Sequence, residues 1–224
     1  MGKTFIQLEW ARLIGKKTLI VAPLSVAKQT VEEAKKINIS VNYCRKQEDC
    51  KNGINITNYE MLDSFSEQDF DSIVLDESSI LKSISGQIKR KLIDNFSGIK
   101  YKLCCSATPA PNDYIEFGNH AEFLGICKRQ EMLSKFFINA NKEHTIELND
   151  QFFKVKGSNN GGQEWRIKHH AEKLFFEWLS NWAIFMTKPS DLGYNDDKYN
   201  LPKLSIDVHY VHFDYCPDDK LFFD

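Results

Sequence analysis

Short apolar runs alternate with helix-like segments along residues 1–127, and no other feature constrains the fold of this chain as strongly. Runs such as 18–22 and 101–105 are mostly apolar, as expected for strands that are buried on both faces of a parallel sheet. Between the runs, apolar residues recur at helical spacing. We therefore predict an α/β domain with a parallel sheet, in which ligands bind at the carboxyl ends of the strands. The expected strands are 18–22, 41–44, 54–57, 71–75 and 101–105, and the expected helices are 5–14, 25–36 and 88–96.

One of these runs, residues 71–75, ends in two adjacent carboxylates, Asp76 and Glu77. Two acids at the end of a buried strand are costly unless a cation or a reaction uses them. One acid of such a pair can hold Mg²⁺ while its neighbour orients or deprotonates a water, which is the Walker B arrangement of nucleotide hydrolases. A strand that ends in a solvated acidic turn would have the same residues, so the pair alone leaves both interpretations open.

Gly2, Lys3 and Thr4 stand directly before the first expected helix. A phosphate-binding loop ends in Gly-Lys-Ser/Thr at such a helix start. Its backbone amides and the helix N-terminus hold phosphate, its lysine reaches the outer phosphates and its hydroxyl binds Mg²⁺. The tripeptide alone could be a chance match, but its position before a helix and a buried strand favours a phosphate site.

A third motif, Ser106-Ala107-Thr108-Pro109, follows the apolar run 101–105. Small hydroxyl residues at a strand end can connect a γ-phosphate site to a neighbouring domain by hydrogen bonds. An ordinary turn would account for these residues too. The three motifs in order, each at the end of its element where ligands are expected, together predict a nucleotide-hydrolysing site.

Composition sets further limits on this chain of 224 residues. The hydrophobic fraction of 42% supports a packed core, and the net charge of −2 does not by itself argue for nucleic acid. The front half is mildly basic and the tail acidic, which is compatible with a polyanion site in the front half. The six cysteines form no CxxC pair, so zinc is not expected, and we infer a reducing cytoplasm. No apolar run approaches the roughly 20 residues that a membrane-spanning helix needs.

The character of the sequence changes after residue 127. We interpret residues 128–190 as a mostly helical insertion packed on the sheet domain, with a helix at 131–141, a hairpin at 146–155 and an aromatic helix at 169–186. Residues 191–224 are predicted to be a linker followed by the start of a second domain, with a strand at 205–213. The expected organisation is a motor-like domain at 1–127, an insertion at 128–190 and a linker region at 191–224.

With these motifs, the chain resembles the first RecA-like domain of a superfamily II helicase, specifically the Snf-type, remodeller-like DNA translocases. The resemblance extends over nearly the whole chain. Residues 2–4 match the end of motif I, 22–25 match motif Ia, 56–60 resemble motif Ib, 76–82 resemble motif II, 106–109 match motif III, and 185–188 with 201–202 resemble the stretch before the second domain. Ser79 replaces the usual Asp or His, and the residues around 112–114 and 164–166 resemble the phage-encoded branch.

The resemblance implies a RecA-like P-loop NTPase fold, with ATP and Mg²⁺ as ligands and a role for each matched residue. It implies that Gly2 and Lys3 bind phosphate, that Thr4 and Asp76 hold Mg²⁺, and that Glu77 positions the attacking water. It implies that Ser106, Ala107 and Thr108 couple hydrolysis to movement. The residues that it places near the backbone of duplex DNA are Pro23, Leu24, Ser25, Thr57 and Tyr59.

The implied function is that of an ATP-dependent DNA helicase or translocase in the cytoplasm of a bacterium or a phage-infected host. Motifs IV to VI belong to a second RecA-like domain, which in this family supplies an arginine worth about 10³-fold or more in rate. We expect this chain to be truncated at both ends, to bind ATP weakly and to turn over little alone. The alternative is a catalytically inactive helicase-like fragment that binds only DNA or protein. An unrelated phosphate-loop enzyme such as a kinase is disfavoured by residues 106–108 and by the segment Tyr59-Glu60.

Overall fold

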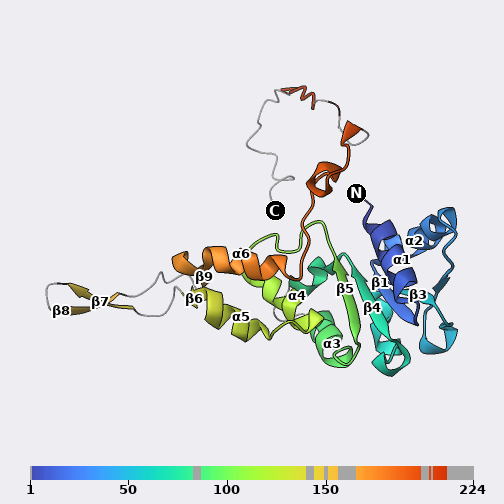
Figure 1. The fold of residues 1–224 in the computed structure, drawn as a ribbon, viewed down its shortest axis with the longest axis horizontal. Helices are drawn as coiled ribbons and strands as arrows, with labels where there is room; N and C mark the ends of the chain where they lie inside the picture. Colours follow the sequence, from blue (N-terminus) through green and yellow to red (C-terminus); the bar gives the residue numbers. More distant parts are fainter. Residues whose placement is uncertain are drawn as a thin grey trace, which may run out of the picture. The chain divides into compact units, whose positions relative to one another are not determined.

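The computed structural model describes residues 2–82, 87–139, 144–148, 151–155, 165–197, 202 and 204–210 (Figure 1). Residue contacts divide the chain into two compact units, residues 1–183 and 184–224. Within the described residues, no helix is both long and apolar enough to cross a membrane.

The first unit is built on a five-stranded sheet in the order β2-β3-β1-β4-β5, and every neighbouring pair is parallel. The register places Ala22 opposite Asn58 and Asp76 opposite Cys105, so the carboxyl ends of four strands lie at one edge of the sheet. The predicted α/β fold with a parallel sheet is therefore confirmed. The strands are β1 (Thr18–Ala22), β2 (Val41–Tyr43), β3 (Ile54–Asn58), β4 (Ser72–Asp76) and β5 (Tyr101–Cys105).

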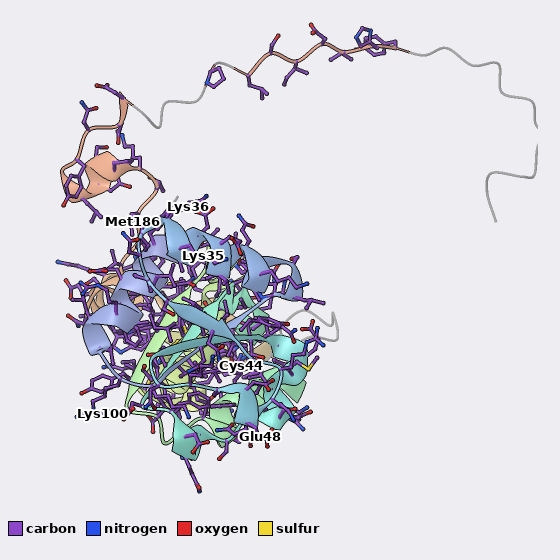
Figure 2. All side chains as sticks on the ribbon, turned by 90° about the vertical axis from the view of Figure 1, so that its right-hand side faces the viewer. Lys35, Lys36, Cys44, Glu48, Lys100 and Met186 are labelled. Atoms are coloured by element: carbon purple, nitrogen blue, oxygen red, sulfur yellow. The ribbon has the colours of Figure 1, made fainter. Side chains whose placement is uncertain are left out.

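Helices cover both faces of this sheet, which explains why its central strands are continuous apolar runs rather than alternating ones. Along β1, Ile20 and Ala22 pack with the helices α1 and α2, whereas Leu19 and Val21 pack on the opposite face. Side chains fill the interior between these layers, and Cys44 lies inside it (Figure 2). The helices of the sheet region are α1 (Lys3–Ile14), α2 (Leu24–Lys36), α3 (Gln87–Asn95) and α4 (Phe117–Leu124), with short 3₁₀ turns η1 (Gln47–Asp49), η2 (Tyr59–Ser64), η3 (Glu67–Asp69), η4 (Ser78–Lys82) and η5 (Tyr114–Glu116).

A second apolar cluster is centred on Phe175, whose side chain is fully buried. Its ring contacts those of Phe117, Phe136 and Phe137 at centroid distances of 5.4 to 6.4 Å. Because Phe117 lies on α4, which also contributes to the sheet core, this cluster packs directly against the sheet region. Its elements are α5 (Arg129–Phe136), β6 (Phe137–Asn139), β9 (Trp165–Ile167), η6 (His169–Ala171) and α6 (Glu172–Ser180).

Two helices of this cluster are shorter than their apolar spacing predicts. The helix expected from residue 131 to 141 stops at Phe136, because residues 137–139 pair antiparallel with β9 instead. The helix expected over 169–186 begins with a 3₁₀ turn and its regular part ends at Ser180. In both places tertiary pairing and packing outweigh the local helical pattern.

The predicted hairpin is present as β7 (His144–Leu148) and β8 (Gln151–Val155), which pair antiparallel. In the second unit, the 3₁₀ turn η7 (Pro189–Leu192) is closed by Asp191, whose carboxylate accepts hydrogen bonds from the backbone and hydroxyl of Thr187. Residues 204–210 form no strand, and residues 211–213 of the strand expected at 205–213 lie outside the described residues. The assignment of residues 191–224 to the start of a second domain stays a prediction.

Truncation of Phe175 should destabilise the protein far more than truncation of its neighbour Phe176, whose side chain is 41% exposed. Phe175→Ala removes a buried ring at the centre of the cluster, and such changes cost about 3–5 kcal/mol. Urea denaturation followed by circular dichroism measures both variants. Equal losses of unfolding free energy in Phe175→Ala and Phe176→Ala would contradict this description of the cluster.

Candidate functional site

Glu77 is the point where three separate segments of the chain meet. Its Oε2 accepts a hydrogen bond from Lys3 Nζ on α1 at 2.7 Å. Its Oε1 accepts one from Ser106 Oγ after β5 at 2.8 Å and one from Ser79 Oγ at 3.1 Å. Residues from the three sequence motifs therefore form one connected network at the carboxyl edge of the sheet.

The backbone of Glu77 is in the left-handed region, with φ of 55°. A residue with a Cβ pays about 1–2 kcal/mol for this conformation, and such strain persists only where the surroundings over-determine it. Here the turn leads the chain from β4 directly into η4, and three hydrogen bonds hold the carboxylate of the strained residue. The strain at this edge of the sheet therefore falls on the residue that joins the motifs.

The same contacts control the charge of Glu77. Burial alone would raise the pKa of this carboxyl, but the hydrogen bonds from Lys3 and Ser106 and the charge of Lys3 outweigh burial and hold the pKa below its ordinary value. Glu77 is consequently ionised at neutral pH. An ionised carboxylate accepts hydrogen bonds and can take a proton or orient a water.

Asp76, the last residue of β4, is 6% exposed and is held from two sides. Its Oδ1 accepts a hydrogen bond from Gln7 Nε2 at 2.7 Å, and its backbone oxygen accepts one from the buried Tyr59 hydroxyl at 2.7 Å. Gln7 was not predicted as a site residue from the sequence. The available signal was a polar residue among the apolar positions of α1, four residues after Lys3.

The Ser-Ala-Thr segment forms a small turn beside Glu77. Ser106 Oγ donates to Glu77 and also accepts the backbone N–H of Thr108 at 3.1 Å. Ala107 and Thr108 are exposed. The turn thus connects the carboxylate with a surface that another domain or a ligand could contact.

The residues after Asp76 and Glu77 are anchored by polar groups of α4, which sequence reasoning missed. His120 is buried, with Nε2 3.2 Å from Ser78 Oγ and Nδ1 3.4 Å from the carbonyl of Glu116. Burial lowers the pKa of His120, so the ring is neutral. The carbonyl can only accept, which assigns the proton to Nδ1 and leaves Nε2 to accept from Ser78. The neighbouring Asn119 donates to the carbonyl of Leu81 at 2.8 Å.

Gly2 and Thr4 lie at the start of α1. Gly2 is the N-cap with φ of 72°, and no side chain caps this helix. The first-turn amides of a helix lack intrahelical acceptors and carry partial positive charge, which suits an anion. Among the described residues, the Thr4 hydroxyl makes no hydrogen bond, so it stays available beside Lys3.

These residues fit Mg²⁺ bound together with a phosphate group. Hydroxyl and carboxylate oxygens are the ligands that Mg²⁺ prefers, and it usually combines one or two carboxylates with substrate phosphates. No cluster of three or more His, Cys, Asp or Glu able to hold a metal occurs in the described part of the chain. Within the described residues, the buried Oε1 of Gln7, whose Nε2 donates to Asp76, has no hydrogen-bond partner. This orphaned acceptor marks the site as one that the chain's own groups do not complete.

The residues predicted to lie near DNA differ in exposure. Leu24 is 57% exposed and Ser25 is exposed, directly after β1. Thr57, by contrast, is fully buried in β3, and the Tyr59 hydroxyl points inward to Asp76. The side chains of Thr57 and Tyr59 therefore have internal contacts here, and their role near DNA stays a prediction.

An open cavity of about 290 Å³ adjoins Glu77 and Ser79 and is also lined by Pro23, Tyr59 and Lys82. A larger cavity of about 380 Å³ lies at the opposite edge of the sheet, where Gly15 and Gly53 line it together with polar residues. None of the predicted site residues lines the larger cavity. Because ligands of parallel sheets bind at the carboxyl ends of the strands, the smaller cavity is the relevant one.

Residues 8–155, more than half of the chain, match the family model described as the SNF2-related domain. No curated protein matches the chain. Among solved structures, 40 chains match, and one of them is the Sulfolobus solfataricus SWI2/SNF2 ATPase core in complex with dsDNA. The identity to that structure is 22% and the TM-score is 0.47; the match covers 60% of this chain and 32% of that chain. The present chain thus spans about a third of the length of that solved chain.

Lys3→Met should raise the pKa of Glu77, because it removes the ion pair and leaves the effect of burial. A ¹³C NMR titration of the Glu77 carboxyl measures the shift. The control is Lys35→Met, since Lys35, labelled on α2 in Figure 2, pairs with Glu32. An unchanged pKa of Glu77 in Lys3→Met would contradict this account of the site.

The same pair predicts a pH dependence of stability. Because the folded-state pKa of Glu77 lies below the unfolded value of about 4.3, the pair stabilises the fold above that pH. The contribution is lost as pH falls through the lower folded pKa. Lys3→Met should therefore show a smaller loss of unfolding free energy than the parent protein between neutral pH and pH values below about 4.

Proposed function

Since this chain belongs to the SNF2-related domain family, we propose that it is an ATP-hydrolysing motor domain, the N-terminal RecA-like domain of a DNA helicase or translocase. The observation that supports this proposal best is the network around Glu77. Lys3, Ser79 and Ser106 come from separate segments and contact the same carboxylate. In a solvated acidic turn, water would satisfy the carboxylate. Hydrogen bonds from a lysine and two hydroxyls to one residue with a strained backbone would not be needed there.

The chain's own residues account for ATP binding and hydrolysis in this proposal. Lys3, at the uncapped start of α1, binds the outer phosphates, and Thr4 and Asp76 hold Mg²⁺. Bound Mg²⁺ neutralises charge on the phosphates. Glu77, ionised and turned toward the same edge, orients the attacking water and accepts its proton.

In this proposal Lys3 exchanges Glu77 for phosphate as its partner. Lys3 Nζ lies 2.7 Å from Glu77 Oε2, so a lysine that turns to phosphate releases that oxygen for water. Ser106 stays bonded to the other oxygen, Oε1. The turn at residues 106–108 is thereby coupled to the state of Glu77, which is the coupling role proposed for Ser106, Ala107 and Thr108.

Two further features complete the proposal. Pro23 lines the cavity at Glu77, and the exposed residues Leu24 and Ser25 that follow it contact the backbone of duplex DNA, so binding depends on salt and only weakly on base sequence. Within the described residues, no arginine forms a hydrogen bond or ion pair with Asp76 or Glu77. A second RecA-like domain supplies that arginine in the proposed enzyme, and without it turnover is slow.

Titration with a fluorescent, non-hydrolysable ATP analogue in Mg²⁺ tests the proposed site. Lys3→Met should weaken binding about 10- to 100-fold, since a hydrogen bond to a charged group contributes about 1.5–3 kcal/mol. Lys35→Met, on the surface of α2, should bind like the parent protein. Loss of affinity in both variants, or in neither, would contradict the assignment of Lys3.

Binding of the ATP analogue separates the proposed motor from the alternative, a catalytically inactive module. A motor domain binds both the analogue and DNA, whereas the alternative binds DNA or protein and no nucleotide. Steady-state hydrolysis by this chain alone should be slow with and without DNA. Robust DNA-stimulated turnover that is abolished by Asp76→Asn would confirm the enzyme and overturn the need for a second domain.

A further inference from the structure

Gln7 occupies an unusual position for a polar side chain. It is fully buried on α1, one helical turn after Lys3, so both side chains are on the same face of the helix. Its amide lies against the end of β4. Nε2 donates to Asp76 Oδ1 at 2.7 Å, and Cys105 stands opposite Asp76 in the sheet register.

The orientation of the Gln7 amide follows from its partner. A carboxylate oxygen accepts hydrogen bonds, so the Nε2 group must face Asp76. The other end of the amide, Oε1, is then directed away from Asp76, and it is buried without a hydrogen-bond partner among the residues that the structure describes. A residue that served only packing would be leucine or methionine here, because burying an unsatisfied amide oxygen destabilises a fold.

We propose that Gln7 is a positioning residue, which holds Asp76 so that its second oxygen, Oδ2, binds the Mg²⁺ that accompanies ATP. The inference rests on the proposed function, since it concerns the same site. Oδ2 makes no hydrogen bond to the described residues, so the contact at Oδ1 fixes the side chain without using the second oxygen. Carboxylates that hold metals are commonly oriented by such hydrogen bonds.

The position of Gln7 on α1 adds a consequence for nucleotide binding. Lys3 and Gln7 are four residues apart on one helix. In the proposed site Lys3 contacts the phosphates, and Gln7 holds Asp76, the carboxylate that binds the metal. A rigid helix therefore sets the distance between the phosphate contact and the metal contact. Loss of the Gln7 amide should weaken the metal contact and leave the phosphate contact intact.

The test measures how Mg²⁺ supports binding of a fluorescent, non-hydrolysable ATP analogue to the full chain. In Gln7→Met, which keeps the length and removes the amide, the Mg²⁺ concentration for half-maximal binding should rise about 10- to 100-fold, the usual cost of losing a group that orients a metal ligand. Affinity in EDTA should be unchanged, because Lys3 remains. Gln29→Met, an exposed glutamine on α2, is the matched control.

A purely structural role for Gln7 gives a different result. In that case Gln7→Met would lower the thermal midpoint and weaken binding equally in Mg²⁺ and EDTA, which would overturn the inference. Gln7→Asn, whose shorter amide cannot reach Asp76, replaces Gln7→Met should that variant not fold, with the same expected result. An unchanged Mg²⁺ requirement in a folded variant overturns the positioning role alone. Failure of the parent protein to bind the analogue at all overturns the proposed function itself.

Discussion

β4 pairs in parallel with β1 on one side and β5 on the other, and the contacts at the candidate site depend on that position. Parallel pairing brings the carboxyl ends of these strands to one edge, where polar residues from distant parts of the chain meet. The helix that precedes β1 supplies Lys3 and Gln7, β4 ends in Asp76, and the loop after β5 supplies Ser106. A shift of β4 within the sheet would separate all of these partners.

The residues at the centre of the site carry an unfavourable free energy, from backbone strain and from burial of a polar atom. Contacts with the surrounding residues offset this free energy. Glu77 adopts a left-handed backbone conformation, and Gln7 buries an amide oxygen that has no hydrogen-bond partner in the described part of the chain. Both lie next to β4, whose five residues are all buried. On the far side, His120 and Asn119 of α4 hold the turn that follows Glu77. Strain at a site that is supported in this way is typical of residues selected for chemistry rather than stability.

Much of the fold could be predicted from the sequence because the central strands are buried on both faces. The expected run 18–22 coincides with β1, and the run 71–75 differs from β4 by one residue at each end. Prediction was weaker where one segment could satisfy two patterns. Residues 137–139 continue an apolar helix in sequence, but they pair with β9, which lies more than twenty-five residues later. Local spacing carries no information about such a distant partner.

The sequence by itself determined the α/β alternation and the three motifs, since residue type and order suffice to recognise a lysine before a helix or two acids after a strand. Only the tertiary structure decided which side chains touch. It joined Lys3, Ser79 and Ser106 to Glu77, buried Thr57, and revealed Gln7 as the partner of Asp76. The physical reason is that hydrogen bonds depend on separations in space, and the pairing of the strands, not the order of the residues, sets those separations.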